Sequence, residues 1–317
     1  MGTDDVERTG LAREGFTFAE ALGAGLSKHR LYRRDLQRPF HGVRTIEMPL
    51  DDHRALCHAY ASRDHAGDVF SHFSAAILHH LPLPRRFCPR GIDVAVFAPR
   101  KPSRVRGVIP HELRPAGHRV VDVEGLRCMS AQDTWAQLSG SIGLTDLIAM
   151  GDFLLTGDEP YSGVRSPWTR DDLAAAAKRH GRRPGVRNLR LALDRIRHGS
   201  LSPQESRLRV ELVDAGLPEP HLNHRIVERD VLLAMVDLAY PDRRVAIEYL
   251  GDHHRTDDEV YQADIYRRER LMAAGWNVVF VTAADLRGQT PRAVLSVRRA
   301  LATASSMIPP GTGVSPD

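Results

Sequence analysis

Residues 231–250 read VLLAMVDLAYPDRRVAIEYL, and this stretch decides the fold of the C-terminal third of the chain. Two apolar runs flank the turn signal Pro241-Asp242-Arg243, and this pattern predicts a β-hairpin. Apolar residues occur on both faces of each run, which is typical of strands in the middle of a sheet. We therefore expect the hairpin to form the centre of a C-terminal sheet.

Two acidic residues interrupt the apolar runs of this hairpin. If its loop has two residues, Pro241 pairs with Arg244, and counting outward places Asp237 opposite Glu248. Opposed Cβ atoms lie about 4.5–5.5 Å apart, so two ionised carboxylates would repel each other in an apolar sheet unless a cation lies between them. The spacing predicts a site for Mg²⁺ (or Mn²⁺), which prefers oxygen ligands and activates water at phosphodiesters. A three-residue loop would break the opposition.

A helix and a strand are expected on each side of the hairpin. The first helix is capped by Ser202 and carries Glu205 in its first turn, and the second is opened by the capping box of Thr256 and Glu259. The other expected elements are the strands HLNHRIVE (221–228) and WNVVFVT (276–282) and a last helix starting at AADLRG (283–288). Up to the last strand, the predicted order is helix, strand, strand, strand, helix, strand.

This order resembles the PD-(D/E)XK nuclease superfamily. Residues 236–257 (VDLAYPDRRVAIEYLGDHHRTD) and 264–286 (DIYRRERLMAAGWNVVFVTAADL) are similar to the nuclease-type domain related to very-short-patch-repair endonucleases, which many actinobacterial proteins carry. The resemblance implies a restriction-endonuclease-like αβββαβ domain that hydrolyses DNA with a divalent metal. It assigns the metal ligands to Asp237 and Glu248, an auxiliary acid to Glu205 and assistance in proton transfer to His254. The other matched positions are Gly251, Asp264, Arg267, Gly275 and Trp276.

The third position of the family's pattern departs from expectation. It is usually Lys and in this subfamily commonly Asp, whereas this chain has Leu250, which can neither bind a metal nor orient water. Asp252, His253 or His254 could substitute for it. The same domain could therefore be an active nuclease or a nuclease-like module that binds DNA without cutting it.

Residues 14–45 suggest a DNA-binding unit. FTFAEALGAG (16–25) predicts a short helix, Ser27 can cap a second helix KHRLYRRDLQ (28–37), and the run VRT indicates a wing strand. This arrangement resembles the winged helix of abortive-infection antitoxin proteins, and its basic side chains would face phosphate. They are Lys28, Arg30, Arg33 and Arg34. A helical pair with a solvated basic face fits the spacing equally well.

The middle of the chain shows no catalytic pattern. A helix at 70–81, strands at 92–98, 107–113 and 118–125 and the helix after Ser130 predict a mixed α/β unit. We expect an α/β (α+β) chain made of several parts. They are a winged-helix-like unit (1–65), a middle α/β antitoxin-like domain (66–155), a linker with a basic helix (156–200), the endonuclease-like domain (201–301) and a disordered tail (302–317).

Composition sets the broad class. The chain has 317 residues, more than one core usually serves, and no apolar run of the ~18 residues that cross a bilayer. Its start, MGTDDVERTG, is acidic where a secretory signal is basic and then apolar, so we expect a cytoplasmic protein without a membrane partner. Three scattered cysteines indicate free thiols rather than a metal cluster.

Charge permits a nucleic-acid partner without requiring one. The formal net charge is +4, and basic residues crowd between Arg165 and Arg209, directly before the nuclease-like domain. The first hypothesis is a metal-dependent endonuclease acting on DNA. The alternative is an antitoxin-type transcriptional regulator with an inactive nuclease-like domain, and a third is a partner in a toxin–antitoxin or defence system. The oligomeric state is left open by the sequence.

Overall fold

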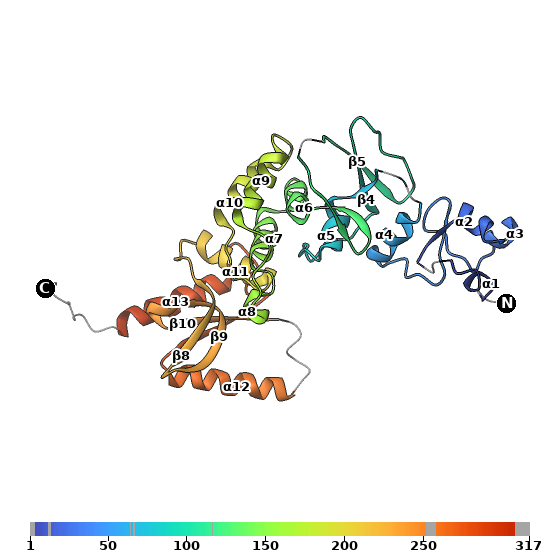
Figure 1. Cartoon of the computed structure of the whole chain (residues 1–317). Helices are drawn as coiled ribbons and strands as arrows, with labels where there is room; N and C mark the ends of the chain where they lie inside the picture. The colour runs from blue at the N-terminus through green and yellow to red at the C-terminus, as the bar shows by residue number, and fades with distance from the viewer. Residues whose placement is uncertain are drawn as a thin grey trace. The chain divides into compact units, whose positions relative to one another are not determined.

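The computed structural model describes residues 4–11, 14–63, 65, 67–115, 117–251 and 258–307. The chain is an α/β protein that divides into two compact units (Figure 1). Unit 1 comprises residues 1–150 and 169–194, and unit 2 comprises residues 151–168 and 195–317. Among the described residues, no helix combines the length and the apolar character needed to span a bilayer.

Unit 1 contains a two-stranded antiparallel sheet, β1 with β2, and a five-stranded mixed sheet in the order β5-β4-β3-β7-β6. Helices α5 and α6 pack beside the larger sheet, and Trp135 of α6 is fully buried, with its Nε1 donating to the backbone oxygen of Leu147. The elements of its first segment are α1 (Asp4–Glu7), β1 (Phe16–Thr17), α2 (Phe18–Gly23), α3 (Lys28–Leu31), β2 (Val43–Arg44), α4 (His53–Ala61), β3 (Val69–Phe70), α5 (His72–Leu78), β4 (Ile92–Phe97), β5 (Val108–Leu113), β6 (Val120–Val123), β7 (Leu126–Met129) and α6 (Ala131–Leu138). Then follow α7 (Leu144–Thr156), which runs on into unit 2, α9 (Arg170–His180) and α10 (Val186–Arg195).

Both N-terminal helices are shorter than expected. The first begins only at Phe18, because Phe16 and Thr17 form β1, and it ends at Gly23. Thr17 makes a capping box with Glu20, and the hydroxyl of Ser27 accepts from the backbone N–H of Arg30. The second helix, however, ends at Leu31, so the expected helix over residues 28–37 is wrong. Tertiary contacts explain the difference, because Arg30 bonds to Asp5 and Asp35 and Gln37 forms a bridge to Thr45.

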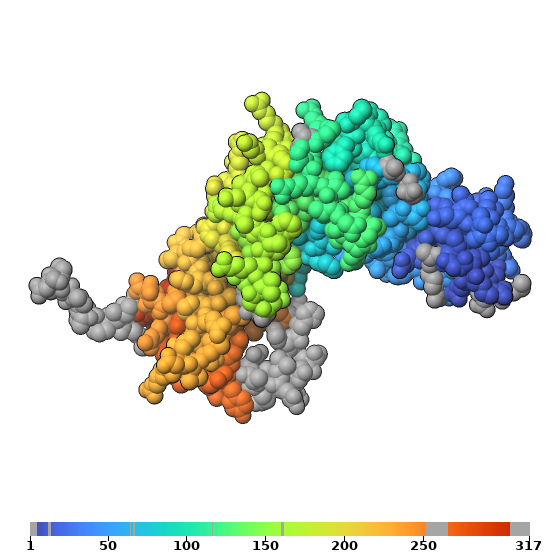
Figure 2. Space-filling view, in the orientation of Figure 1, coloured from blue at the N-terminus to red at the C-terminus, as the bar shows by residue number. Residues whose placement is uncertain are grey.

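Unit 2 is built around a four-stranded sheet in the order β11-β10-β9-β8. From α11 onward the elements follow the predicted order of helix, three strands, helix and strand. The elements of unit 2 are α8 (Glu159–Ser162), α11 (Pro203–Asp214), β8 (His221–Glu228), β9 (Val231–Tyr240), the 3-10 turn η1 (Pro241–Arg243), β10 (Val245–Leu250), α12 (Asp258–Ala273), β11 (Asn277–Thr282) and α13 (Arg292–Met307). In Figure 2 the yellow-green atoms of residues 151–168 lie against the yellow atoms that follow residue 195.

The central hairpin is antiparallel, as the sequence predicts, but its loop is longer than two residues. Tyr240 pairs with Val245, so residues 241–244 form the turn, with Arg244 in the left-handed region at φ 47°. Compared with the prediction, one residue from each strand has joined the turn. Because the turn grew equally on both sides, the register of the two strands is unchanged. Asp237 therefore still faces Glu248, one step beyond the last ladder pair of Leu238 with Ile247.

Helices cover both faces of the unit 2 sheet. Leu208 of α11 and Val297 of α13 share one buried cluster with Leu238 and Ile247, whereas Leu271 of α12 belongs to a second cluster. Figure 1 shows α12 running along the opposite side of the strands from α13. Both central strands are thus buried on both faces, as their apolar runs indicate.

The helix expected to start at residues 283–288 is absent at that place, which lies within the described chain. Asp285 instead folds back on the end of β11, where its Oδ2 accepts from the backbone N–H and the hydroxyl of Thr282. The final helix, α13, begins only at Arg292. The chain makes only a turn there, because Gly288 takes the left-handed value φ 92°, and α13 begins directly after Pro291.

Candidate functional site

The site begins where strands β9 and β10 separate. Beyond the pair of Leu238 with Ile247, the backbone N–H of Tyr249 donates to Oδ2 of Asp237 at 2.7 Å. The carboxylate of Asp237 thus takes the place of a backbone acceptor at the point where the ladder ends. Its side chain is fixed by this bond, and Oδ1 is the oxygen left to meet a ligand.

The second acid, Glu248, lies on β10 and is 5% exposed. Its Oε1 accepts from Nη2 of Arg267 at 2.8 Å, and Arg267 comes from α12, on the face that this helix covers. The Arg267 side chain is 35% exposed, so one side of the ion pair reaches solvent. This contact places a cation beside the two acids.

The third acid, Glu205, comes from the first turn of α11. The hydroxyl of Ser202 caps this helix by accepting from the backbone N–H of Glu205, as the sequence predicts. Oε2 of Glu205 accepts from the backbone N–H of Leu201 at 2.9 Å and from Nδ2 of Asn223 at 3.0 Å. Because Asn223 lies on β8, two elements hold the Glu205 carboxylate in place.

Burial raises the affinity of two of these acids, Asp237 and Glu205, for protons. Burial raises the pKa of Asp237, although the Tyr249 N–H and the Arg267 charge act to lower it. Burial and the neighbouring charge of Asp237 raise the pKa of Glu205 to about 6. Glu205 and Asp237 therefore sense each other's charge, and a cation between them would favour their ionised forms.

These residues fit a hard divalent ion. All three donors are carboxylates, the ligand type that Mg²⁺ and Mn²⁺ prefer. Their oxygens are not all within 4.8 Å of one another, since the one described trio of that kind lies in unit 1. An ion here would therefore take one or two of the carboxylates directly and fill its other positions with water, as Mg²⁺ usually does.

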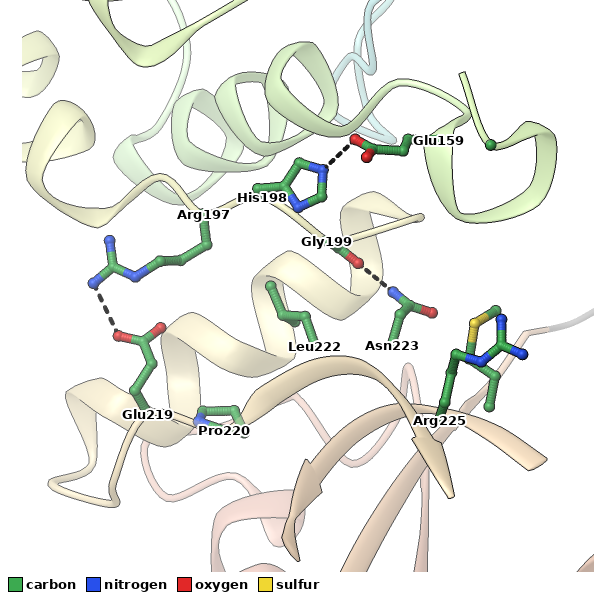
Figure 3. A pocket seen from close by; sticks show the side chains of 11 residues that line it. Glu159, Arg197, His198, Gly199, Glu219, Pro220, Leu222, Asn223 and Arg225 are labelled. Atoms are coloured by element: carbon green, nitrogen blue, oxygen red, sulfur yellow. Dashed lines mark hydrogen bonds and ion pairs between the residues drawn. The ribbon is translucent and has the colours of Figure 1, made fainter. Parts of the chain in front are cut away.

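A pocket of about 560 Å³ adjoins this site within unit 2 (Figure 3). Asn223 lines the pocket and also bonds to Glu205, and this residue is the link between the pocket and the acids, which do not themselves line it. Arg225, from the same strand, is exposed at its edge. Around the rim, Arg197 pairs with Glu219 and His198 pairs with Glu159, as the dashed lines in Figure 3 show.

Several residues proposed from the sequence lie outside the described part of the chain. Asp252, His253 and His254 fall in the gap at 252–257. Asp264 lies in α12, and its side chain is also outside the described residues. Their assigned roles stay predictions, whereas Glu205, Asp237, Glu248 and Arg267 are described and gather in one place.

Arg30 does not face solvent, which corrects its proposed contact with phosphate. It is 6% exposed and bonds to both oxygens of Asp5, at 2.6 and 2.9 Å, and both oxygens of Asp35, at 3.1 and 2.9 Å. The positive charge of Arg30 is therefore neutralised within unit 1. It holds α1 and α3 together and lowers the pKa of Asp5. Lys28, Arg33 and Arg34 are exposed, and their contact with nucleic acid stays a prediction.

Comparison with known proteins gives relatives without a stated function. No protein-family model matches the chain. Two relatives from Mycobacterium tuberculosis, the uncharacterized proteins MT2308 (strain CDC 1551 / Oshkosh) and Rv2248 (strain ATCC 25618 / H37Rv), are each 31% identical over 127 residues. The match covers 40% of this chain and 46% of either relative, so the chain spans about half the length of the curated relatives it matches.

Sequence reasoning missed Asn223. The register of β8 against β9 passes from Leu222 opposite Leu238 to His224 opposite Val236, which sets Asn223 opposite Asp237. Asn223 also has φ 42°, a left-handed value that Asn tolerates better than most residues. Counting outward from the turn at Arg229-Asp230 would have set Leu222 opposite Asp237, because it misses the register shift between Ile226 and Val227. Only the structure therefore places Asn223 beside the acids.

Proposed function

We propose that the chain is a metal-dependent endonuclease that hydrolyses phosphodiester bonds in DNA. The observation that carries the proposal is the gathering of Glu205, Asp237 and Glu248 at the fork between two central strands. Two buried acids, from α11 and β10, and a half-buried acid from β9 are costly to hold together, and a divalent ion offsets that cost.

The surroundings of the three acids suit them to different roles in the reaction. Asp237 and Glu248 would hold the ion, which when bound supplies Lewis acidity at phosphate and lowers the pKa of water. Glu205, whose pKa is about 6, can accept the proton of the attacking water near neutral pH. Asn223 keeps the Glu205 carboxylate oriented through the bond to Oε2.

Arg267 supports the proposal at the position where the family's pattern is broken. Leu250 offers no charge, whereas Arg267 brings a guanidinium to 2.8 Å from Glu248. Its cation can balance the charge that develops on a phosphate as it is cleaved. We therefore assign to Arg267 the electrostatic part that a strand lysine would otherwise play.

The basic surroundings of the acids support a polyanionic substrate. Arg225 is exposed at the adjoining pocket, and Arg268 and Arg270 are exposed on α12. Phosphate contacts of this kind supply affinity without reading sequence. DNA is the substrate class that we propose, and RNA is an arm of the test below.

Cleavage by the full-length protein tests the function. Supercoiled plasmid, single-stranded DNA and RNA are incubated with the protein in Mg²⁺, in Mn²⁺ and in EDTA. We expect cutting of DNA that needs the metal. Asp237→Asn and Glu248→Gln should each slow it on the order of 100-fold or more, because a metal ion's stabilisation of the reacting charges amounts to several kcal/mol. Arg267→Ala should also slow it.

Matched variants separate the site from its neighbourhood. Asp242→Asn changes an exposed acid in the turn of the same hairpin, and Arg299→Ala changes an exposed arginine on α13, on the other side of the sheet from α12. Both should cut as fast as the wild type. If the wild type does not cut in either metal, or if the Asp237 and Glu248 variants cut at its rate, the proposed function is wrong.

A further inference from the structure

Three metal-ligating side chains meet in unit 1, away from any pattern visible in the sequence. They are His72, Asp93 and His111, and one ligand atom from each lies within 4.8 Å of the other two. Among the described residues, this is the group of three with that property. The sheet brings them together, because Asp93 on β4 pairs with Ile109 on β5, two residues before His111 on the same face.

The cluster has two nitrogen donors and one oxygen donor in close contact. Oδ1 of Asp93 lies 2.8 Å from Nε2 of His111, and the His72 and His111 rings stack with their centroids 3.8 Å apart at 16°. Nδ1 of His72 bonds to the hydroxyl of Ser71 at 3.0 Å. When Nδ1 donates in that bond, the lone pair of His72 lies on Nε2 and is available to a ligand.

Bonds to neighbouring residues hold the cluster in place. The backbone N–H of His72 donates to Oε1 of Gln137 at 3.1 Å. A second layer fixes the carboxylate strand, since the backbone N–H of Asp93 donates to Ser74 Oγ, which bonds in turn to His53.

Two features show that this arrangement is held at a cost. Asp93 is 3% exposed, and burying a carboxylate is unfavourable unless a strong partner balances its charge. His72 has φ 46°, a left-handed value that is strained for a non-glycine residue. Strain of this kind concentrates at functional sites. His111 has a side chain 23% exposed, so solvent reaches one side of the cluster.

We propose that His72, Asp93 and His111 bind a divalent transition-metal ion of the zinc class, with water at the position open to solvent. Bonds of about 2.0–2.2 Å to nitrogen and oxygen place neighbouring ligand atoms roughly 3.0–3.5 Å apart, so the cluster closes on an ion by small rotations of the stacked rings. Imidazole ligands select such ions over Mg²⁺. The site is independent of the proposed nuclease site, which offers only carboxylates.

Cobalt absorption in the full-length protein tests this site. The chain is freed of metal by chelation and titrated with Co²⁺, whose visible d–d band reports nitrogen and oxygen ligands in a site of low coordination number. We expect the band to saturate at one ion per chain and to disappear when Zn²⁺ is added. His111→Gln and Asp93→Asn should each weaken Co²⁺ binding at least about tenfold, because each removes a ligand.

Two controls make the result specific. His58→Gln changes a partly exposed histidine of the same unit that lies 3.7 Å from Glu124, and it should bind Co²⁺ like the wild type. The double variant Asp237→Asn with Glu248→Gln should keep the band while it loses any nuclease activity. A wild type that gives no saturable band displaced by Zn²⁺ overturns the proposal whether or not the variants fold. So does an unchanged band in both folded ligand variants, with folding checked by circular dichroism.

Discussion

Glu205 holds its proton more tightly in the folded chain than an exposed glutamate does. Its pKa rises from 4.5 to about 6 because the side chain is buried and because Asp237 is negatively charged. The folded state therefore binds more protons than the unfolded state between these two values. Stability from this group is present below about pH 4.5 and is lost as pH rises through 6, by about 2 kcal/mol in all.

Glu205→Gln should remove this part of the pH dependence. In metal-free buffer, we expect the free energy of unfolding of the variant to change less than that of the wild type between pH 4.5 and 6.5, by about 2 kcal/mol. Urea denaturation at several pH values measures the difference. Glu228→Gln, an exposed change on β8, should keep the wild-type profile. Equal profiles for the wild type and Glu205→Gln would contradict the raised pKa.

The sequence does not distinguish Arg30 from Arg267, whereas the structure gives the two arginines different surroundings. Both are arginines on helices with acids nearby in sequence. Arg30 is 6% exposed and satisfied by Asp5 and Asp35, whereas the side chain of Arg267 is 35% exposed and joins the acid cluster. Burial depends on which distant segment packs over a side chain, so the fate of each arginine could not be predicted from local pattern.

At the scale of elements, a buried ion pair fixes α11 in unit 2. The Arg209 side chain is 2% exposed, and its Nη2 donates to Oδ2 of Asp152 at 2.9 Å and to the backbone oxygen of Arg195. Its Nη1 donates to Glu219 at 2.7 Å. One guanidinium thus joins α11 to the end of α7, the end of α10 and the segment before β8, and so helps to position Glu205 on the same helix.

Arg209→Met should destabilise unit 2 strongly. The change leaves Asp152, which is fully buried, without its ionic partner, and breaking such a pair costs about 3–5 kcal/mol. Urea denaturation followed by Trp fluorescence measures the loss. Arg292→Met removes a comparable pair with Asp285, but its side chain is 82% exposed, so we expect less than about 1 kcal/mol. Similar losses for both variants would show that the buried pair adds nothing special.

Elements whose limits are set by local chemistry were predictable. Ser202 caps α11, and the strands at 221–228 and 231–240 have the predicted ends, because caps and turn residues act within a few positions. The helices expected at 28–37 and 283–288 were wrong. In the first place Arg30 bonds to Asp5, which lies far away in sequence, and in the second Gly288 takes a left-handed conformation at φ 92°.

At the scale of the whole molecule, the chain passes between its two compact units more than once. Residues 151–168 belong to unit 2, and residues 169–194 then return to unit 1. Asp152, the partner of Arg209, lies in the inserted segment. A domain cut at residue 201 therefore omits a buried partner of its own core.

Two fragments test this organisation. Residues 144–317 keep α7 and Asp152, whereas residues 201–317 lose both. We expect the shorter fragment to unfold at a lower urea concentration, and Arg209→Met to destabilise it less than it destabilises the longer fragment, since the partner is already missing. Equal midpoints for the two fragments, or equal effects of the substitution in both, would contradict a unit 2 that includes residues 151–168.

The sequence by itself determined the α/β class and the order of elements from α11 to β11, whereas it left the hairpin register dependent on the length of the loop. The class and the order follow from periodicity, caps and turns, which act over short distances along the chain. Only the tertiary structure decided that Arg267 bonds to Glu248, that Arg30 is buried and that His72, Asp93 and His111 meet. These side chains come together through strand order and helix packing. Such contacts join residues far apart in the chain, so the local sequence around one residue does not indicate its partner.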